Sequence, residues 1–184
     1  MKRCDWVTTD ELYIKYHDEE WGKPVYDDET LFELLVLESF QAGLSWLTIL
    51  RKRENFRKAF DGFDYKLIAN YSPDKVSELL KNDGIIRHRG KIEASINNAQ
   101  RFMEIQQEFG SFSKYIWSFV NHLPIINNFT SIKQVPATTA ISDALAKDLK
   151  KRGFKFMGSS TVYAFMQAVG MVNDHIVGCE CRFK

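Results

Sequence analysis

The sequence predicts an all-α protein, and two observations lead to this prediction. Apolar residues recur at three- and four-residue spacing along most of the chain, which is the period of a helix packed on one face. The segments with this spacing are bounded by residues that begin and end helices, and none shows the alternation of a half-buried strand. A chain of 184 residues, 45% of them hydrophobic, is long enough to bury one core, so we expect a single domain over residues 1–184.

Each predicted helix begins after a residue that can cap an N-terminus or ends before a glycine. Ser72 and Pro73 give the clearest start, because a serine cap followed by proline suits the first turn of a helix. Residues 127–141 are rich in serine and threonine and predict a loop. In chain order, the predicted helices cover 29–42 (after Asp27 and Asp28, ending at Gly43), 45–60, 73–81, 89–109 (before Gly110), 111–120, 142–152 (capped by Ser142, before Gly153) and 160–169 (before Gly170).

The composition excludes several classes of protein. The longest apolar runs have four or five residues, far fewer than a membrane span needs. The residues after Met1 lack the apolar stretch of a secretory signal, and an odd count of three cysteines argues against a disulfide framework. We therefore expect a cytoplasmic protein of a reducing compartment, with no membrane partner.

The net charge of +1 favours no class of partner, but the basic residues are unevenly distributed. Residues 51–58, 81–91 and 147–155 hold 14 of the 25 lysines and arginines. If the fold brings these segments to one face, they form a basic surface for nucleic acid. Three solvated helix ends explain the charge equally well, because lysine and arginine are common in last turns.

Glu38 lies on the same helical stripe as Leu31, Leu34 and Leu35, and the other faces of this predicted helix are also mostly apolar. A buried carboxylate is costly unless it has partners, and no basic residue lies one turn away. Glu38 is therefore either half of a buried ion pair with a distant arginine or a carboxylate at the floor of a binding pocket.

Aromatic residues occur both before and after Glu38 in the sequence. Trp46 follows the helix of Glu38, and four more aromatic residues crowd the N-terminal segment. Flat aromatic faces beside a carboxylate are what a pocket for a flipped nucleobase requires, although core packing explains any single one of them. The four residues are Trp6, Tyr13, Tyr16 and Trp21.

Residues 84–91 connect two predicted helices and carry several basic side chains. Gly84 and Gly90 permit unusual backbone conformations and a close approach to a ligand. The free amides at the start of the second helix then favour a DNA phosphate, although an ordinary turn with a basic tip is the alternative interpretation. The basic residues of this turn are Arg87, Arg89 and Lys91.

Two cysteines and two histidines lie near opposite ends of the chain. Cys4 and His17 form one potential ligand pair, and His175 and Cys179 form another. Two thiolates and two imidazoles suit tetrahedral Zn²⁺, and four protein ligands leave no position for a reactive water. Such a metal would be structural, with Cys181 as a possible substitute for Cys179. The spacing alone leaves open that these are unrelated polar residues near frayed ends.

Several short blocks occur in the order typical of one known family. They are residues 3–7, 16–22, 41–46, 84–92, 117–121, 151–156 and 172–175. On these blocks the chain resembles the 3-methyladenine DNA glycosylase I family over essentially its whole length. The resemblance implies a helix-hairpin-helix glycosylase fold with the helix-hairpin-helix element at about 73–109. It also implies a structural zinc that joins the terminal segments, about 1–22 and 171–184, through Cys4, His17, His175 and Cys179.

The resemblance also implies roles for the candidate residues. Glu38 is expected to hydrogen-bond the edge of a flipped methylated adenine, and Leu44 to fill the gap left in the duplex. Further expected contacts are stacking on the base by Tyr16 and Trp46, proximity to the base of Trp6 and Tyr13, and contacts with DNA by Gln41, Gly43, Gly84, Arg87, Arg89, Gly90 and Lys91.

The implied activity is hydrolysis of the N-glycosidic bond of 3-methyladenine in alkylated double-stranded DNA. We expect a monofunctional enzyme that leaves an abasic site, acts as a monomer without an obligate protein partner, and is associated with a bacterial nucleoid. No aspartate lies between Lys91 and Ser142, which matches a family that lacks the catalytic aspartate of related glycosylases. A lesion-binding module without turnover is the alternative, and a zinc hydrolase is disfavoured by four matched ligands.

Overall fold

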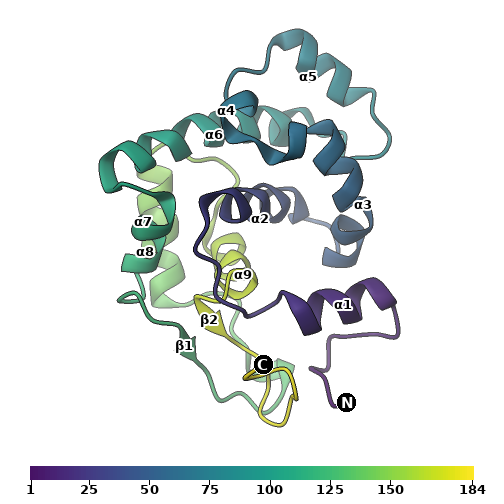
Figure 1. Cartoon of the computed structure of the whole chain (residues 1–184), viewed down its shortest axis with the longest axis vertical. Helices are drawn as coiled ribbons and strands as arrows, with labels where there is room; N and C mark the ends of the chain where they lie inside the picture. Colours follow the sequence, from purple (N-terminus) through teal and green to yellow (C-terminus); the bar gives the residue numbers. More distant parts are fainter.

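The structure is a computed structural model that describes the whole chain, residues 1–184, and it is predominantly helical (Figure 1). No helix is both long enough and apolar enough to span a membrane. The elements are α1 (Glu11–Glu19), α2 (Asp28–Gln41), α3 (Trp46–Ala59), η1 (Asp61–Phe63), α4 (Tyr65–Ile68), α5 (Pro73–Leu80), α6 (Arg89–Phe109), α7 (Phe112–Ser118), β1 (Ile125–Ile126), η2 (Ile132–Gln134), α8 (Ala140–Lys151), α9 (Ser159–Ala168) and β2 (Val172–Asn173).

Helix α2 lies at the centre of the molecule and is surrounded by α3, α6, α7 and α9 (Figure 1). The run from Leu34 to Phe40 is buried without interruption, so this helix is apolar on all sides rather than on one stripe. A helix with this pattern is stable only inside a core. One continuous hydrophobic core joins α2 to elements from α3 to β2, and a smaller cluster joins the N-terminal segment to residues near the C-terminus.

The structure confirms most predicted helices to within two residues, and local capping explains the agreement. Asp27 accepts a hydrogen bond from the Thr30 amide at 2.9 Å, and Ser72 accepts one from the Lys75 amide at 3.2 Å. The predicted cap of α8 is wrong. Thr139 is the N-cap, and the Ser142 hydroxyl accepts a hydrogen bond from the Thr139 amide at 2.7 Å. The two side chains form a reciprocal capping box, so the helix begins almost one turn before its predicted start.

Several short elements were not predicted. Helices α1 and α4 lack a long apolar stripe, and the two strands have only two residues each, which is too short to show alternation. Strands β1 and β2 pair in parallel, with Ile125 opposite Val172. This pairing ties the loop after α7 to the segment that follows α9. The main fold class, predominantly helical, is nevertheless confirmed.

The two terminal segments lie side by side (Figure 1). The Glu180 amide donates to the Lys2 carbonyl at 3.0 Å, and the Lys2 amide donates to a Glu180 carboxylate oxygen at 2.9 Å. At Gly170, which has φ of +73°, an added Cβ would lie 2.3–2.5 Å from the backbone of Lys23 and Pro24. Only glycine permits this approach, so the end of α9 is seated directly on the segment after α1.

A partly buried ion-pair network joins the end of α1 to α2 and α3. The Arg53 guanidinium, on α3, donates from Nη1 to both Glu20 carboxylate oxygens at 2.9 and 3.0 Å. Its Nη2 donates to Glu33 of α2 at 3.0 Å, and Arg57 donates to the same carboxylate at 2.6 Å. The Arg53 and Glu33 side chains are largely buried, whereas Glu20 and Arg57 are 40% and 39% exposed, so solvent screens the outer part of the network. The network therefore sets the position of α1 relative to α2.

Candidate functional site

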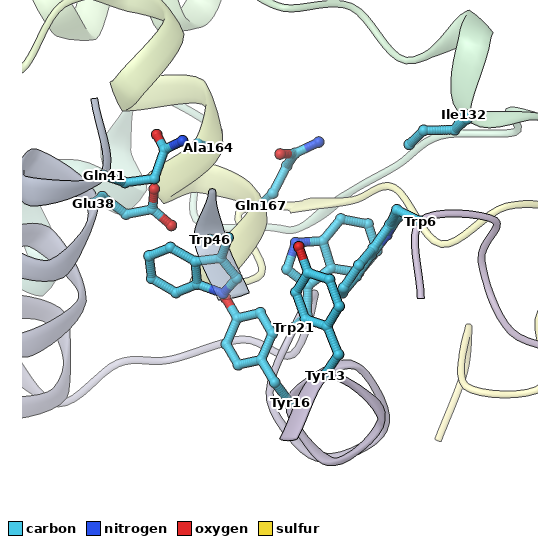
Figure 2. Close-up of a pocket in the computed structure, with 10 residues that line it drawn as sticks. All are labelled: Trp6, Tyr13, Tyr16, Trp21, Glu38, Gln41, Trp46, Ile132, Ala164 and Gln167. Atoms are coloured by element: carbon cyan, nitrogen blue, oxygen red, sulfur yellow. The ribbon is translucent and has the colours of Figure 1, made fainter. Parts of the chain in front are cut away.

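A cavity of about 230 Å³ lies between α1 and the N-terminal segment on one side and α2 and α9 on the other (Figure 2). Half of its ten lining residues are aromatic, and Glu38 lies at one end with Gln41 and Trp46 nearby (Figure 2). The residues that line it are Trp6, Tyr13, Tyr16, Trp21, Glu38, Gln41, Trp46, Ile132, Ala164 and Gln167.

Glu38 is 4% exposed, and its carboxyl group has neither an ion-pair partner nor a hydrogen-bond donor within the chain. The buried arginine that could have been its distant partner, Arg53, is instead paired with Glu20 and Glu33. Burial raises the pKa of Glu38 to about 8, because the low-dielectric surroundings disfavour the charged form. An unpaired carboxyl in a cavity is a site for a ligand that supplies hydrogen-bond donors or positive charge.

The aromatic residues form two walls of the cavity (Figure 2). Tyr16 and Trp46 have ring centroids 5.4 Å apart, and Trp6 packs edge-on against Tyr13 with centroids 5.1 Å apart. The indole N–H groups of Trp6 and Trp46 are buried and have no acceptor. Burial also raises the pKa of Tyr16 well above its usual range, so its hydroxyl stays neutral. The cavity thus offers flat faces, unused donors and a carboxyl group.

The turn between α2 and α3 projects beside the cavity and is held from within. The Leu44 amide donates to the Gln41 carbonyl at 2.7 Å, and the Gln41 side-chain amide donates back to the Leu44 carbonyl at 2.5 Å. Gly43 has φ of +80° with no atom near its missing Cβ, so it is needed for backbone conformation rather than for space. Gly43 is exposed and Leu44 is half-buried, which leaves a firm apolar tip at the surface.

Lys91 differs from the sequence prediction. Its side chain is 7% exposed, and its ammonium group donates to the carbonyls of Phe40 and Ala42 at 2.9 and 2.8 Å. These are unpaired carbonyls at the C-terminal end of α2, where a cation also complements the helix dipole. The prediction that this side chain faces DNA is therefore corrected: Lys91 supports the turn that carries Leu44.

The rest of the turn at residues 84–91 is exposed at its basic tip, where Arg87 and Arg89 lie on the surface. The prediction of an unusual backbone conformation at Gly84 is not confirmed; an added Cβ there would instead lie 3.0–3.1 Å from Asn82 and Asn55. The amides that begin α6 are partly used, because His88 Nδ1 accepts a hydrogen bond from the Lys91 amide at 3.0 Å.

A second cavity, of about 620 Å³, lies at the connection between α8 and α9. It is lined by three lysines and by the exposed Phe156, and the N-cap residue of α9, Gly158, supplies no side-chain cap. The sequence indicated that segment 147–155 is basic. It did not indicate that lysines of this segment lie beside the uncapped N-terminus of α9. The lysines are Lys147, Lys150 and Lys155.

The three basic segments meet near this cavity. The ring of Phe156 lies 5.9 Å from that of His88 between centroids, which joins segment 147–155 to segment 81–91. Lys52 donates to the Asp83 carbonyl at 3.4 Å, which brings segment 51–58 to the same turn. The arginines of that third segment, however, pair with acidic residues, as Arg53 and Arg57 do with Glu33. In segment 81–91, Lys91 is buried and Arg89 pairs with Glu93, so the unpaired charge comes mainly from the lysines of segment 147–155.

Cys4, His17, His175 and Cys179 lie together and are all buried. The Cys179 Sγ atom is 3.4 Å from His175 Nδ1 and 3.6 Å from His17 Nε2, and the Cys4 Sγ atom is 3.6 Å from His175 Nδ1. Ligand atoms around a tetrahedral metal ion are separated by similar distances. Four residues from opposite ends of the chain therefore form a group that could hold a metal ion.

The outer hydrogen bonds of this cluster orient the two imidazoles for metal binding. His175 Nε2 donates to the Trp21 carbonyl at 2.8 Å, and His17 Nδ1 donates to an Asp18 carboxylate oxygen at 2.7 Å. Each histidine therefore turns its unprotonated ring nitrogen toward the cysteines, and His17 Nε2 also accepts a long hydrogen bond from the Cys4 amide at 3.4 Å. Burial lowers the pKa of His175 to about 4 and raises that of Cys4 to about 12, so the imidazole is neutral and the thiol needs a cation to ionise.

The cluster also supports the cavity wall. The Trp21 ring lies 4.7 Å from the His175 ring between centroids, and the Trp6 ring lies 5.3 Å from the His17 ring. Both tryptophans line the cavity on their other side. The remaining cysteine, Cys181, lies 3.4 Å from an Asp18 carboxylate oxygen and outside the four-residue group.

Three residues of the cavity were not predicted from the sequence: Ile132, Ala164 and Gln167. Ala164 and Gln167 are three residues apart on a helix that was predicted, and such spacing indicates a shared face. Nothing in the sequence shows which face of that helix meets Glu38.

This geometry defines a helical protein with a small cavity lined by aromatic side chains and by a buried, unpaired carboxyl group. A family model described as methyladenine glycosylase matches residues 6–183, and the chain belongs to this family. The chain is 52% identical to DNA-3-methyladenine glycosylase 1 of Escherichia coli strain K12 over 181 residues, which are 98% of this chain and 97% of that protein.

Two solved structures support the same assignment. The structure of 3-methyladenine DNA glycosylase I from Staphylococcus aureus, solved to explain its recognition of 3-methyladenine, superposes with a TM-score of 0.96 at 41% identity and covers 100% of this chain and 98% of that chain. A tyrosine-to-phenylalanine variant of 3-methyladenine DNA glycosylase I in complex with 3-methyladenine gives a TM-score of 0.97 at 40% identity, covering 100% and 99% of the two chains.

The raised pKa of Glu38 predicts a loss of stability at alkaline pH. Because the pKa in the folded state lies above the unfolded value, the stabilising effect of protonation is complete below pH 4.5 and is lost as pH rises through about 8. The difference is at most about 5 kcal/mol, at about 1.4 kcal/mol per pKa unit. We expect Glu38→Gln to remove this pH dependence, as measured by urea unfolding from pH 5 to pH 9. Glu29→Gln, at the exposed start of the same helix, is the control. If the free energy of unfolding changes equally with pH in the wild-type protein and in both variants, the raised pKa does not belong to Glu38.

Proposed function

We propose that the protein hydrolyses the N-glycosidic bond of 3-methyladenine in alkylated double-stranded DNA and leaves an abasic site. The observation that carries this proposal is the unpaired, buried carboxyl group of Glu38 in an aromatic cavity that is small enough for a single base. The relatives named for 3-methyladenine, at 52% identity and across almost the whole chain, support the same substrate. As a repair enzyme with bacterial relatives, it is proposed to work as a monomer on nucleoid DNA in the cytoplasm.

The charge of the lesion explains how the cavity selects it. Methylation at N3 gives the adenine a formal positive charge, whereas normal adenine is neutral. A cation beside Glu38 lowers the raised pKa of that carboxyl group and restores the carboxylate, so the lesion gains a charge-assisted hydrogen bond that normal adenine lacks. Stacking on Tyr16 and Trp46 adds a cation–π interaction, which also favours the cationic lesion over normal adenine. Trp6 and Tyr13 close the other side of the cavity.

The same charge makes the bond easy to break. When the C1′–N9 bond breaks, its electron pair goes to the base, which leaves as neutral 3-methyladenine and needs no protonation. The sugar becomes oxocarbenium-like, water adds at C1′, and one proton is released. The barrier left for the enzyme is therefore small, which accounts for a site without a catalytic aspartate. Glu38 holds the cationic base in the cavity until the bond breaks.

The turn at residues 41–45 suits the opening of the duplex. Leu44 is its apolar tip, and an apolar side chain inserted between base pairs fills the space that a flipped nucleotide leaves. Gln41 and Lys91 hold this turn from within, so its shape exists before DNA arrives. Gln41 and Gly43 then lie close to the DNA strand.

The DNA backbone has two candidate contacts, and the structure favours the one that the sequence interpretation did not choose. The turn at 84–91 presents Arg87 and Arg89, but the start of α6 is capped by His88. The connection between α8 and α9 presents Lys147, Lys150 and Lys155 beside a helix N-terminus that has no side-chain cap. Free amides and lysines together bind phosphate best. We therefore assign the main phosphate contact to the α8–α9 hairpin, with Arg87 and Arg89 as a flanking contact.

The Cys4, His17, His175 and Cys179 group fits a structural Zn²⁺. Two thiolates and two neutral imidazoles are the usual ligands of this ion, and four protein ligands complete its coordination. The ion would supply no chemistry to the reaction. Its role would be to hold the terminal segments together and, through Trp6 and Trp21, to keep the cavity wall in place.

The first test is incubation of the purified protein with methylated duplex DNA, followed by chromatography of the released bases. We expect 3-methyladenine to be released and 7-methylguanine to stay on the DNA. Glu38→Gln should slow release by about 10- to 100-fold, the value of one hydrogen bond to a charged group, and Glu29→Gln should not. If the folded protein binds methylated DNA but releases no base, it is a lesion-binding module rather than an enzyme.

The zinc proposal predicts different outcomes for two neighbouring cysteines. Cys179→Ser should lose bound zinc and melt at a markedly lower temperature, because binding free energy contributes directly to folding. Cys181→Ser should keep about one zinc ion per chain, since Cys179 completes the four ligands. Zinc content by mass spectrometry and melting by circular dichroism measure both effects. Loss of zinc from both variants, or from neither, would refute the ligand assignment.

The two DNA contacts are distinguished by the salt dependence of binding. Replacing Lys147, Lys150 and Lys155 by Gln should reduce the slope of log K against log salt by about 0.9 for each phosphate that these lysines neutralise. Replacing Arg87 and Arg89 by Gln should reduce it less. Fluorescence anisotropy with an undamaged duplex measures these slopes without base release. If the Arg87 and Arg89 replacements reduce the slope more than the lysine replacements do, the main phosphate contact is instead the turn at 84–91.

A further inference from the structure

Asp174 is a buried carboxylate that the proposed reaction does not use. It is 1% exposed, and no lysine or arginine pairs with it. Three neutral groups donate to it: Asn127 Nδ2 to Oδ1 at 2.7 Å, Gln167 Nε2 to Oδ2 at 2.9 Å, and the Tyr163 hydroxyl to Oδ2. Each of these partners is a donor, which is how a buried carboxylate is satisfied without a counter-ion.

One of these donors, Gln167, also lines the cavity that contains Glu38. A carboxylate accepts hydrogen bonds and repels a carbonyl oxygen, so Asp174 determines which end of the Gln167 amide faces it. The nitrogen is held toward Asp174, and the oxygen has no partner within the chain. Figure 2 shows this oxygen on the side of the cavity where Glu38 and Gln41 lie, with the nitrogen turned away.

When Glu38 is ionised, which occurs above its pKa of about 8 or beside a bound cation, the cavity presents two acceptors, the Glu38 carboxylate and the Gln167 carbonyl. The amino group at position 6 of an adenine carries two hydrogens, so it can donate to two acceptors at once, whereas a guanine carries an oxygen at that position. The guanine oxygen at position 6 has no hydrogen to donate, so it and both protein acceptors would lack a hydrogen-bond donor. Unpaired polar groups of this kind are costly in a buried site.

We propose that Gln167, with its amide orientation fixed by Asp174, selects methylated purines that carry an amino group at position 6 over those that carry an oxygen. Gln167 is a specificity residue and Asp174 is its positioning residue. This inference rests on the proposed function, because it concerns which base the same cavity accepts.

Binding of free bases at pH 9, where Glu38 is a carboxylate, tests the inference without any turnover. Trp6, Trp21 and Trp46 line the cavity, so tryptophan fluorescence reports its occupation. We expect the wild-type protein to bind 3-methyladenine more tightly than 3-methylguanine. Gln167→Met keeps the length of the side chain but removes the acceptor, and should reduce this preference by about tenfold, the value of one hydrogen bond.

Asp174→Asn should reduce the preference in the same direction, because the new amide can donate as well as accept and lets the Gln167 amide turn over. Tyr163→Phe is the matched control, since it removes a different donor from Asp174 and leaves the Gln167 contact in place. Its ratio of affinities should stay at the wild-type value. Circular dichroism identifies any variant that does not fold, and Gln167→Met, on the cavity side, keeps the test valid if Asp174→Asn unfolds.

The outcomes separate the two proposals. A preference unchanged in Gln167→Met overturns the role of Gln167 while leaving the glycosylase proposal intact. A preference reduced in Tyr163→Phe as much as in Asp174→Asn shows that Asp174 acts only through stability, which overturns its positioning role. If the wild-type protein binds neither base, the assignment of this cavity to the base fails, and the inference fails with it.

Discussion

The closure of the chain at its two ends is the constraint on which the rest of the structure depends. Cys4 and His17 come from the first segment, His175 and Cys179 from the last, and their ligand atoms lie within 4.8 Å of one another. Tryptophans packed on these histidine rings form one wall of the cavity, and Glu38 on the central helix forms its floor. The contacts of α1 with α3, the Arg53 network and the hydrogen bond from the Gly22 amide to the Gln167 backbone carbonyl at 3.0 Å also hold this wall.

The energetic cost of the site is concentrated in one side chain. An unpaired carboxyl group 4% exposed is unfavourable in the isolated protein, and its raised pKa expresses this cost. The surrounding core tolerates it because α2 is packed on all sides by large aliphatic and aromatic residues. In the proposed function, a cationic ring relieves this cost when it enters the cavity. The burial of Glu38 that destabilises the empty protein is therefore the same feature that favours a positively charged ligand.

Some parts of the site follow directly from local sequence, and others do not. The position of Glu38 on an apolar helix was sufficient to indicate a pocket carboxyl or a buried ion pair, and the structure decided between them because Arg53 is committed elsewhere. Lys91 carried the same charge signal as Arg87 and Arg89, yet its ammonium group lies on the end of α2. The sequence shows that a residue is charged but not where its side chain points. The four-carbon side chain of lysine can point either into the protein or toward solvent.

The sequence by itself determined most of the helices, most of their caps, the buried carboxyl, the aromatic cluster and the four candidate ligands, because each depends on residues one or two turns apart or on residue chemistry alone. Tertiary structure decided which surfaces meet. It placed Gln167 in the same cavity as Glu38, joined two basic segments at Phe156 and left the start of α9 uncapped beside three lysines. The first two of these contacts join residues far apart in the chain, and the geometry of all three is set by how helices pack against one another, which no local pattern encodes.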